Sequence, residues 1–276
     1  AEAFPQLTEW EKDFGSILKG FIKGRTPQQH KGTFSFKNGL KSLTERLATR
    51  LKPKILYGQR VSQIDCQSDG SFRLKIQDAQ APELIKQPIR QLVSTIPAHQ
   101  LSPMIASLDP SFAQQLLHIP YPAVNVVATA YQKPQIDHPL DGFGALHNQL
   151  ESSETLGTIF TSSIFPNRAP SDQHLLTTFI GGSLHPDKGM APDEALKEMV
   201  RVDHKRFLGM RGQPVFQHVF RWEKAIPQYT QCIPAIRPLV EKWEKQRLFV
   251  GGNWWGGIAV SSCLKRAHEL AEILCG

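Results

Sequence analysis

The segment that most constrains the fold is "RLFVGGNWWGGIAVSSCLKRAHELAEIL", residues 247–274. Its short apolar start predicts a buried strand, the glycines at 251, 252, 256 and 257 predict a tight turn, and the apolar spacing after Ile258 predicts a helix. Such a turn is typical of a nucleotide site, because the first turn of a helix offers unpaired N–H groups and the positive end of the helix dipole. The spacing is not GxGxxG, a motif that these 276 residues lack, so an ordinary structural turn explains it as well.

The helix and the two tryptophans of this segment carry two further expectations. An indole pair between glycines is costly to expose, so we expect Trp254 and Trp255 to cover something flat. We expect the helix to bury an apolar face made of Cys263, Leu264, Ala267, Leu270, Ala271 and Leu274.

The rest of the chain alternates between helical and strand-like patterns. Helical spacing covers residues 4–22, 40–51, 104–117, 190–208 and 235–246. Strand-like runs cover residues 33–36, 54–77, 91–96, 123–132, 156–165, 175–182 and 214–222, with Ser68-Asp69-Gly70 as a hairpin turn. This order predicts an α/β fold with α+β character, in which one domain is interrupted by a second.

The net charge of +7 lies entirely within residues 1–60, which hold twelve basic and five acidic residues. A basic end of this kind attracts nucleic acid, anionic lipid or an acidic substrate, or it is a solvated face whose acidic counterpart lies elsewhere. Because no module of interleaved basic and aromatic residues accompanies it, we expect no nucleic-acid partner.

The sequence also bears on the compartment. No apolar run reaches the ~18 residues of a membrane span, and residues 1–11 lack the apolar core of a secretory signal. The four cysteines lie far apart without a CxxC pair, so we expect reduced thiols and a cytoplasmic protein. Neither the cysteines nor the ten histidines have ligand spacing, so we expect no metal site.

Five segments, in order, resemble the FAD-dependent, oxygen-using protoporphyrinogen oxidases. The segment "FSFKNGLKSLTERLATRLKPKILYGQRVSQI" is similar to their central FAD-domain segment, and "GFGAL" and "LGTIFTSSIFPNRAPSDQHLLTTFIGG" are similar to their substrate domain. The segments "RWEKAIPQY" and "GGNWWGGIAVSSC" resemble their C-terminal end. The resemblance covers nearly the whole chain but only the C-terminal three-fifths of a typical member, whose N-terminal GxGxxG unit is absent. The terminal turn is then expected to be the second half of a split FAD site.

The resemblance also implies a domain organisation. Residues 1–29 would be a helical connector from the missing N-terminal part, and residues 30–103 the central part of the FAD-binding domain. Residues 104–213 would form the substrate-binding domain, and residues 214–276 the C-terminal part of the FAD-binding domain. The expected fold is an incomplete, Rossmann-like FAD-binding domain interrupted by a substrate domain with a mixed or antiparallel sheet and flanking helices.

Cofactor contacts follow only from the resemblance. Val61 matches a valine whose backbone meets the adenine, and Trp222 matches an aromatic position beside the isoalloxazine. Ile258, Ala259 and Val260 match the stretch whose backbone approaches the flavin. Without the resemblance, each of these residues is explained by ordinary packing in a strand or at a helix start.

Substrate contacts follow in the same way. Leu146, Ile159 and Phe179 match apolar positions that hold the tetrapyrrole, whereas core packing is the alternative for all three. One departure concerns the residues after "GFGAL": most members continue with an apolar residue and proline, but His147 and Asn148 follow here.

The implied activity is oxidation of protoporphyrinogen IX to protoporphyrin IX by hydride transfer to FAD, with O2 as acceptor. Such chemistry needs no acid–base constellation, and we name no catalytic side chain. Because the phosphate-binding half of the site is missing, we expect weak FAD binding by this chain and self-association through uncovered surface. The basic end could also contact an anionic membrane. The alternatives are a non-catalytic fragment that acts as a binding module, or another flavin amine-oxidase-like enzyme such as a carotenoid desaturase.

Overall fold

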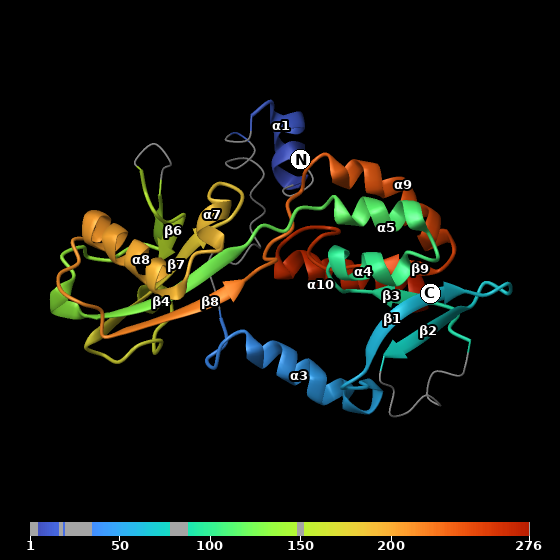
Figure 1. Cartoon of the computed structure of the whole chain (residues 1–276), viewed down its shortest axis with the longest axis horizontal. Helices are drawn as coiled ribbons and strands as arrows, with labels where there is room; N and C mark the ends of the chain where they lie inside the picture. The colour runs from blue at the N-terminus through green and yellow to red at the C-terminus, as the bar shows by residue number, and fades with distance from the viewer. Residues whose placement is uncertain (1–4, 17–18, 20–34, 78–87, 148–151, 276) are drawn as a thin grey trace. The chain divides into compact units, whose positions relative to one another are not determined.

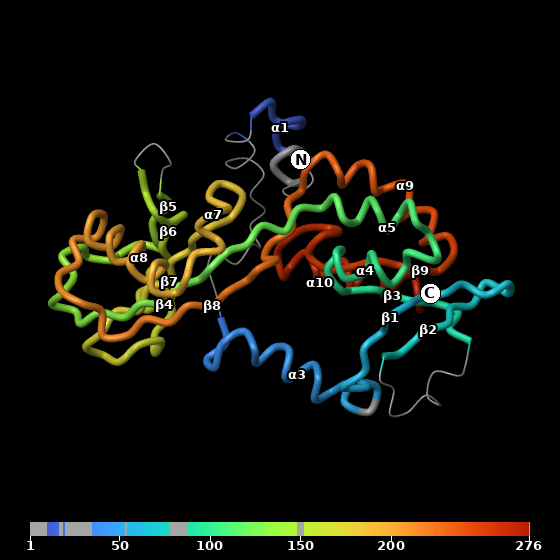
Figure 2. Tube along the Cα trace, in the orientation of Figure 1, coloured from blue at the N-terminus to red at the C-terminus, as the bar shows by residue number. Residues whose placement is uncertain are grey.

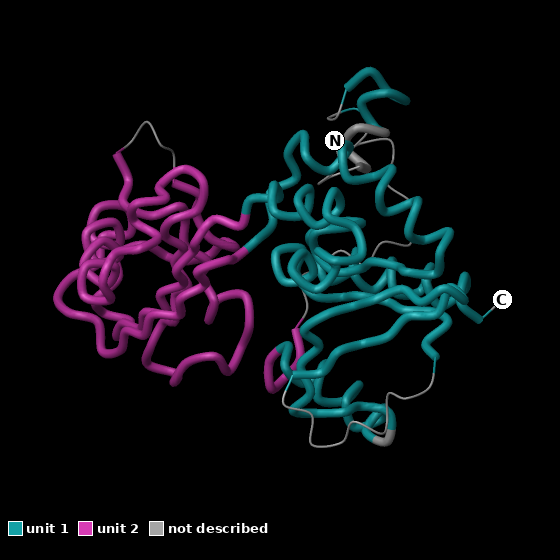
Figure 3. Tube along the Cα trace, turned by 45° about the vertical axis from the view of Figure 1, so that its right-hand side comes forward, with its two compact units in different colours: residues 1–32, 40–120, 226–276 teal, residues 33–39, 121–225 magenta. Residues whose placement is uncertain are grey.

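The computed structural model describes residues 5–16, 19, 35–77, 88–147 and 152–275. The chain divides into two compact units (Figure 3). Unit 1 comprises residues 1–32, 40–120 and 226–276, and unit 2 comprises residues 33–39 and 121–225. Unit 2 is thus inserted into unit 1. The sequence prediction of mixed α/β structure in which one domain interrupts another is confirmed.

The boundaries of the units differ from those expected at residues 104 and 213, because the fold joins elements that sequence spacing separated. Helix α5 (Pro110–Leu117) packs against α4 (Ala98–Ile105) and α9 (Cys232–Lys245) and therefore belongs to unit 1. Strand β8 (Phe216–Trp222) pairs with β4 (Val124–Gln132) and belongs to unit 2. Figure 2 follows the chain from α5 into β4 and from β8 back to α9.

Unit 1 contains two small sheets. Strands β1 (Arg60–Cys66) and β2 (Phe72–Gln77) form an antiparallel hairpin, and Gly70 in its predicted turn has a φ of +79°. Strands β3 (Leu92–Ser94) and β9 (Leu248–Val250) are parallel and lie far apart in the sequence. The other helices are α1 (Pro5–Phe14), α3 (Lys41–Leu51), η1 (Lys52–Lys54) and α10 (Val260–Cys275).

Asp109 links α5 to α9 in unit 1. Its carboxylate caps α5 by accepting a 2.9 Å hydrogen bond from the Phe112 N–H, and it also accepts from Lys242 Nζ at 2.8 Å and Trp243 Nε1 at 2.9 Å on α9. Burial alone would raise the pKa of Asp109, but the hydrogen bonds from Lys242, Phe112 and Trp243 outweigh it and lower that pKa. The carboxylate therefore joins the two helices in its charged form.

Helix α10 corrects one expectation. Of the six residues predicted to be buried, only Leu270 is buried, and Leu264 is 52% exposed. The helix turns its other side inward, where Arg266 Nε donates to the Val250 carbonyl and Arg266 forms an ion pair with Glu244 of α9. The leucine and alanine face is left uncovered by the described residues.

Unit 2 is a five-stranded antiparallel sheet in the order β5-β6-β7-β4-β8 (Figure 1). Helix α8 packs on one face, where Leu196 and Val200 meet Val127 and Ile180. Besides β4, β8 and η3 (Lys133–Gln135), the elements are β5 (Gly144–Leu146), β6 (Gly157–Ile159), α6 (Thr161–Ile164), β7 (Gln173–Gly181), α7 (Pro186–Gly189) and α8 (Asp193–Leu208). The run expected as a strand over 156–165 is a three-residue strand followed by a short helix.

Candidate functional site

The glycine-rich turn after β9 is fastened by a tyrosine. The Tyr229 hydroxyl accepts a 2.9 Å hydrogen bond from the Gly257 N–H and donates a 3.0 Å hydrogen bond to the Asn253 carbonyl. It therefore joins the two sides of the turn. Tyr229 lies within "RWEKAIPQY", and no local sequence pattern predicts its contact with a turn 24 residues further along the chain.

Two glycines of the turn are required by the fold itself. Gly252 has a φ of +100°, and a Cβ there would lie 3.1 Å from the Thr95 carbonyl oxygen. Gly257 has a φ of +121°, and a Cβ there would lie 2.7 Å from the side chain of Ser262. At both positions the space of the missing Cβ is taken by the protein's own atoms, so the turn itself requires glycine.

Ile258, Ala259 and Val260 follow this turn directly. Helix α10 begins at Val260, two residues later than expected, so Ile258 and Ala259 form the lead-in to the helix. Ile258 is half-buried, whereas Ala259 and Val260 are exposed. The exposed pair gives a ligand access to backbone at the helix start.

The two tryptophans of the turn have different surroundings. Trp254 is fully buried in unit 1, and its indole Nε1 donates to the Ile96 carbonyl at 3.0 Å. The guanidinium of Arg237 lies 5.5 Å above the ring of Trp255. Trp254 is thus a core residue that anchors the turn to the chain after β3, and its ring is not a platform for a flat ligand.

Val61 lines a cavity of about 830 Å³ in unit 1, formed by the β1–β2 hairpin, the end of β3 and the start of α4. Arg60, Thr95 and His99 also line it. The Gly251 N–H donates to the Ser94 carbonyl at 2.9 Å, so the glycine turn begins beside the same strand end. Ligands of open α/β folds bind at the carboxyl ends of parallel strands, and both β3 and β9 end here.

The predicted substrate residues share one face of the unit 2 sheet. Leu146 is paired with Gly157, and Gly157 with Phe179, so Leu146 and Phe179 stand on one cross-strand row. Ile159 is two residues from Gly157 and points to the same side. This row continues through Val126 to Phe220 on the opposite edge of the sheet. We call this side of the sheet, which faces away from α8, the open face.

Trp222 also lies on the open face, and it is 58% exposed. Phe216, His218 and Phe220 alternate with residues that face α8, and the His218 ring lies 4.5 Å from the Phe220 ring centroid. Sequence reasoning missed these three residues, although the period-two aromatic spacing of "FQHVFRW" was a usable signal. The open face therefore presents a row of aromatic side chains.

The structure thus forms two groups from the eight predicted residues. Leu146, Ile159, Phe179 and Trp222 share one face within unit 2. The other four lie in unit 1. Val61 lines the cavity, and residues 258–260 lie at the start of α10.

A sequence profile of the flavin-containing amine oxidoreductases matches residues 3–275. The chain belongs to this family. It is 29% identical to the mitochondrial protoporphyrinogen oxidase of Nicotiana tabacum over 99% of this chain and 60% of that protein. It is 26% identical to coproporphyrinogen III oxidase of Staphylococcus aureus over 98% of this chain and 59% of that protein. The family resemblance stated from the sequence is confirmed.

A solved structure supports the same fold. A crystal structure provisionally named protoporphyrinogen oxidase, from Exiguobacterium sp. 255-15, matches with a TM-score of 0.75 at 22% identity, over 98% of this chain and 58% of that one. The chain therefore spans about three fifths of the length of the relatives that it matches. Within the described ranges, no helix has the length and apolarity to cross a membrane.

Proposed function

We propose that this chain is part of an FAD-dependent oxidase that converts a porphyrinogen to a porphyrin. The observation that carries the proposal is the open face of unit 2, where Leu146, Phe179 and Trp222 share one side of the sheet. A flat, mostly apolar macrocycle needs such a surface. The relatives named for protoporphyrinogen and coproporphyrinogen oxidation support the same substrate class.

Each substrate residue has a proposed role on that face. Phe179 stacks against the macrocycle, while Leu146 and Ile159 hold it at the β5–β6 edge of the sheet. Leu146 is 94% exposed, so it has no packing role within the described part of the chain that would explain a leucine here. Ligand contact gives this side chain a function.

The described residues fit an FAD molecule in two places. We assign Val61 and the cavity around it to the adenosine end, and the backbone of Ile258, Ala259 and Val260, which follows the glycine turn at a helix start, to the flavin end. Trp222 is proposed as the aromatic side chain beside the isoalloxazine. When bound, the flavin supplies a hydride acceptor, and O2 is the proposed final acceptor.

The chain's own contribution is placement. The open face excludes water from one side of the macrocycle, and no side chain of the chain is assigned a proton transfer. The first-turn amides of α10 favour the extra negative charge of a reduced flavin by about 1 kcal/mol.

We further propose that the chain alone holds only half of an FAD site and binds FAD weakly. Neither a GxGxxG motif nor its phosphate-binding turn is present in these 276 residues. Each tenfold loss of affinity corresponds to about 1.4 kcal/mol, so a few missing pyrophosphate hydrogen bonds are sufficient.

Partners and location complete the proposal. Exposed Val260 and Leu264 support self-association through α10. The protein is proposed to be cytoplasmic, with its basic residues in peripheral contact with an anionic membrane. The alternatives are a non-catalytic porphyrin-binding module and a different reaction of the amine oxidoreductase family.

Titration with metal-free porphyrins tests the proposal. Protoporphyrin IX and coproporphyrin III, the oxidised forms of the two candidate substrates, should quench the protein's tryptophan fluorescence with micromolar affinity. Coproporphyrin carries more carboxylates, so tighter binding of coproporphyrin at low salt would favour that substrate class. Absence of binding by both porphyrins would overturn the proposed substrate. Near-stoichiometric flavin absorbance at 450 nm in the purified protein would overturn the half-site proposal.

A further inference from the structure

The β5–β6 hairpin is the least supported edge of the open face. Each of its strands has three residues, and β5 pairs only with β6. Two further backbone hydrogen bonds flank this pairing, from the His147 N–H to the Leu156 carbonyl at 3.1 Å and from the Phe160 N–H to the Phe143 carbonyl at 3.0 Å. So short a pairing leaves the position of Leu146 dependent on other contacts.

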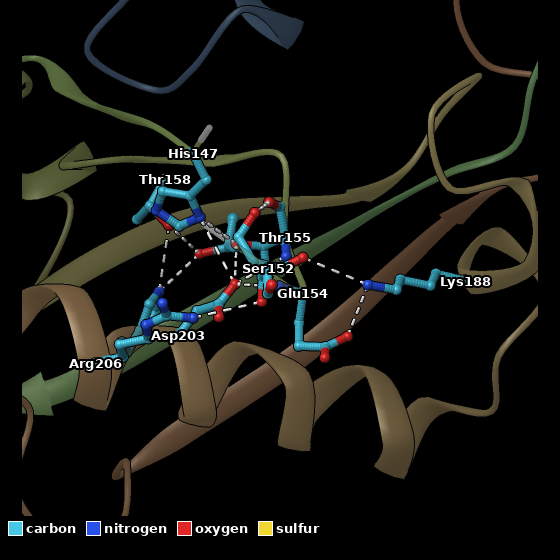
Figure 4. Close-up of polar contacts among 11 residues, drawn as sticks. His147, Ser152, Glu154, Thr155, Thr158, Lys188, Asp203 and Arg206 are labelled. Carbon is cyan, nitrogen blue, oxygen red and sulfur yellow. Dashed lines mark hydrogen bonds and ion pairs between the residues drawn. The ribbon is translucent and has the colours of Figure 1, made fainter. Parts of the chain in front are cut away.

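Those contacts come from Asp203, a fully buried residue of α8 (Figure 4). A single oxygen, Asp203 Oδ2, accepts hydrogen bonds from the Glu154 N–H at 2.9 Å, the Thr155 N–H at 2.8 Å and the Thr155 hydroxyl at 2.8 Å. Hydrogen bonds to a charged acceptor are shorter and stronger than those between neutral groups. Asp203 thereby anchors the chain just before β6.

His147 connects the same carboxylate to the chain just after β5. Its Nδ1 lies 2.6 Å from Thr155 Oγ1 and 3.7 Å from Asp203 Oδ2. The Thr155 hydroxyl has one hydrogen, which it donates to Asp203, so it accepts from His147 and the Nδ1 atom carries a proton. The other ring nitrogen, Nε2, is buried and has no hydrogen-bond partner among the described residues.

Two cations add contacts to the same segment: Lys188, which is partly buried, and Arg206, which is exposed. Lys188 forms a 2.7 Å ion pair with Glu154, and its Nζ lies 3.5 Å from the Ser153 carbonyl. Arg206 Nη1 lies 3.5 Å from the Ser152 carbonyl (Figure 4). The contacts of Asp203 are buried and shielded from water, so they dominate the anchoring.

We propose that Asp203 and His147 are positioning residues for porphyrin binding: they join the two strands of the β5–β6 hairpin to α8 and so hold Leu146 in line with Phe179. This inference rests on the proposed function, because it assumes that a porphyrin lies on the open face. Neither residue touches the macrocycle. Their effect reaches it through the hairpin, whose exposed leucine immediately precedes His147.

The test uses the full chain and metal-free protoporphyrin IX, followed by fluorescence quenching. His147→Ala removes the Nδ1 donor, and we expect about tenfold weaker binding, equivalent to about 1.4 kcal/mol. His147→Asn places an amide N–H close to the position of Nδ1 and should restore the affinity to within about threefold of wild type. Glu198→Gln, on the same helix but paired with Arg201 outside this cluster, should bind as wild type does.

If His147→Ala does not fold, a second pair of variants tests the same hydrogen bond from the Thr155 side. Thr155→Val keeps the shape of the side chain but removes its hydroxyl, whereas Thr155→Ser keeps the hydroxyl. Valine should weaken porphyrin binding about as much as His147→Ala does, and serine should not.

Each outcome has a separate meaning. A wild-type chain that does not bind the porphyrin overturns the proposed function and the inference with it. If the wild-type chain binds the porphyrin, and His147→Ala, His147→Asn and Thr155→Val bind it with the same affinity, the inference alone is overturned. Equal weakening by His147→Ala and His147→Asn would also overturn it, because the hydrogen bond would then be irrelevant.

Discussion

Leu146 of β5 and Phe179 of β7 are both paired with Gly157 of β6, the strand between them. Their side chains therefore lie on the same face of the sheet, with a residue that has no side chain between them. A Cβ at Gly157 would lie 2.7 Å from the Ala145 carbonyl oxygen and 3.2 Å from the Leu146 Cα. The glycine therefore allows β5 to lie close to β6, and the Leu146 side chain lies over it, with Cδ2 3.3 Å from the position of that Cβ. A flat ligand on this face would meet both Leu146 and Phe179.

Leu146→Asp should weaken the binding of protoporphyrin IX at least tenfold, because it puts a charge where an apolar ring would lie. The leucine is almost fully exposed, so the free energy of unfolding should change by less than about 0.5 kcal/mol. Val202→Asp, at an exposed position on α8, is the matched control and should leave porphyrin affinity unchanged. Fluorescence titration and urea unfolding measure the two quantities. Equal affinities of the two variants would exclude Leu146 from the ligand surface.

Alanine substitutions at Gly256 and Gly257 should separate backbone strain from steric clash, the two ways in which a side chain destabilises the glycine turn. At Gly256 the φ is +90°, and an added Cβ would only contact Arg266 at 3.7 Å, so Gly256→Ala should cost about 1–2 kcal/mol of backbone strain. At Gly257 the added Cβ would also clash with Ser262, so Gly257→Ala should cost about 1 kcal/mol more than that. Urea unfolding of both variants measures the difference. The reverse order of stabilities would show that the turn relaxes around residue 257.

The stability of the protein should fall as the pH falls below about 6.5. Burial, followed by the nearby His147, lowers the pKa of His204 to about 3, against 6.5 for an ordinary histidine. Between these two values the unfolded chain binds a proton that the folded chain does not, so each pH unit costs up to about 1.4 kcal/mol. Urea unfolding from pH 7.5 to pH 4.5 should show this slope, and His204→Gln should flatten it. If the free energy of unfolding of His204→Gln falls with pH as steeply as that of the wild type, other groups cause the pH dependence.

Asp203 adds a second loss of stability at lower pH. Burial opposes its charge, but His147 and the hydrogen bonds from Thr155 outweigh burial and hold the pKa of Asp203 below its usual 3.8. A depressed carboxyl pKa stabilises the folded state above 3.8, and that stabilisation is lost as the pH falls through the lower, folded-state pKa. Acid should therefore release the β5–β6 hairpin from α8 after His204 has already destabilised the unit. Amide hydrogen exchange at Glu154 and Thr155 should report this release.

Local patterns predicted much of the fold. The 3.6-residue spacing of α8, the hairpin turn at Gly70 and the β-branched runs of β4 and β7 each specify an element without tertiary help. The substrate residues could be proposed because five separate segments resemble one family. Long-range contacts could not be predicted from local patterns. Tyr229 forms hydrogen bonds with residues of the glycine turn that are distant in sequence, and Asp203 accepts a hydrogen bond from Thr155, 48 residues earlier in the chain.

The exposure of α10 was also unpredictable, because an apolar stripe indicates a buried face without saying what buries it. Val260, Leu264, Ala267 and Ala271 are exposed at alternating spacings of four and three residues, which is the pattern of a helix that packs against another helix. We therefore expect the wild-type chain to self-associate as its concentration rises. Sedimentation velocity over a concentration series measures this association.

Leu264→Glu should shift that association toward the monomer by at least tenfold in the dissociation constant, because it buries a charge in the contact. The leucine is half-exposed, so the isolated subunit should lose little stability. Lys265→Glu, at an exposed position of the same helix away from the stripe, also adds negative charge and should associate as wild type does. If the wild-type chain stays monomeric throughout, or if both variants dissociate equally, the stripe on α10 is not the surface through which copies of this chain meet.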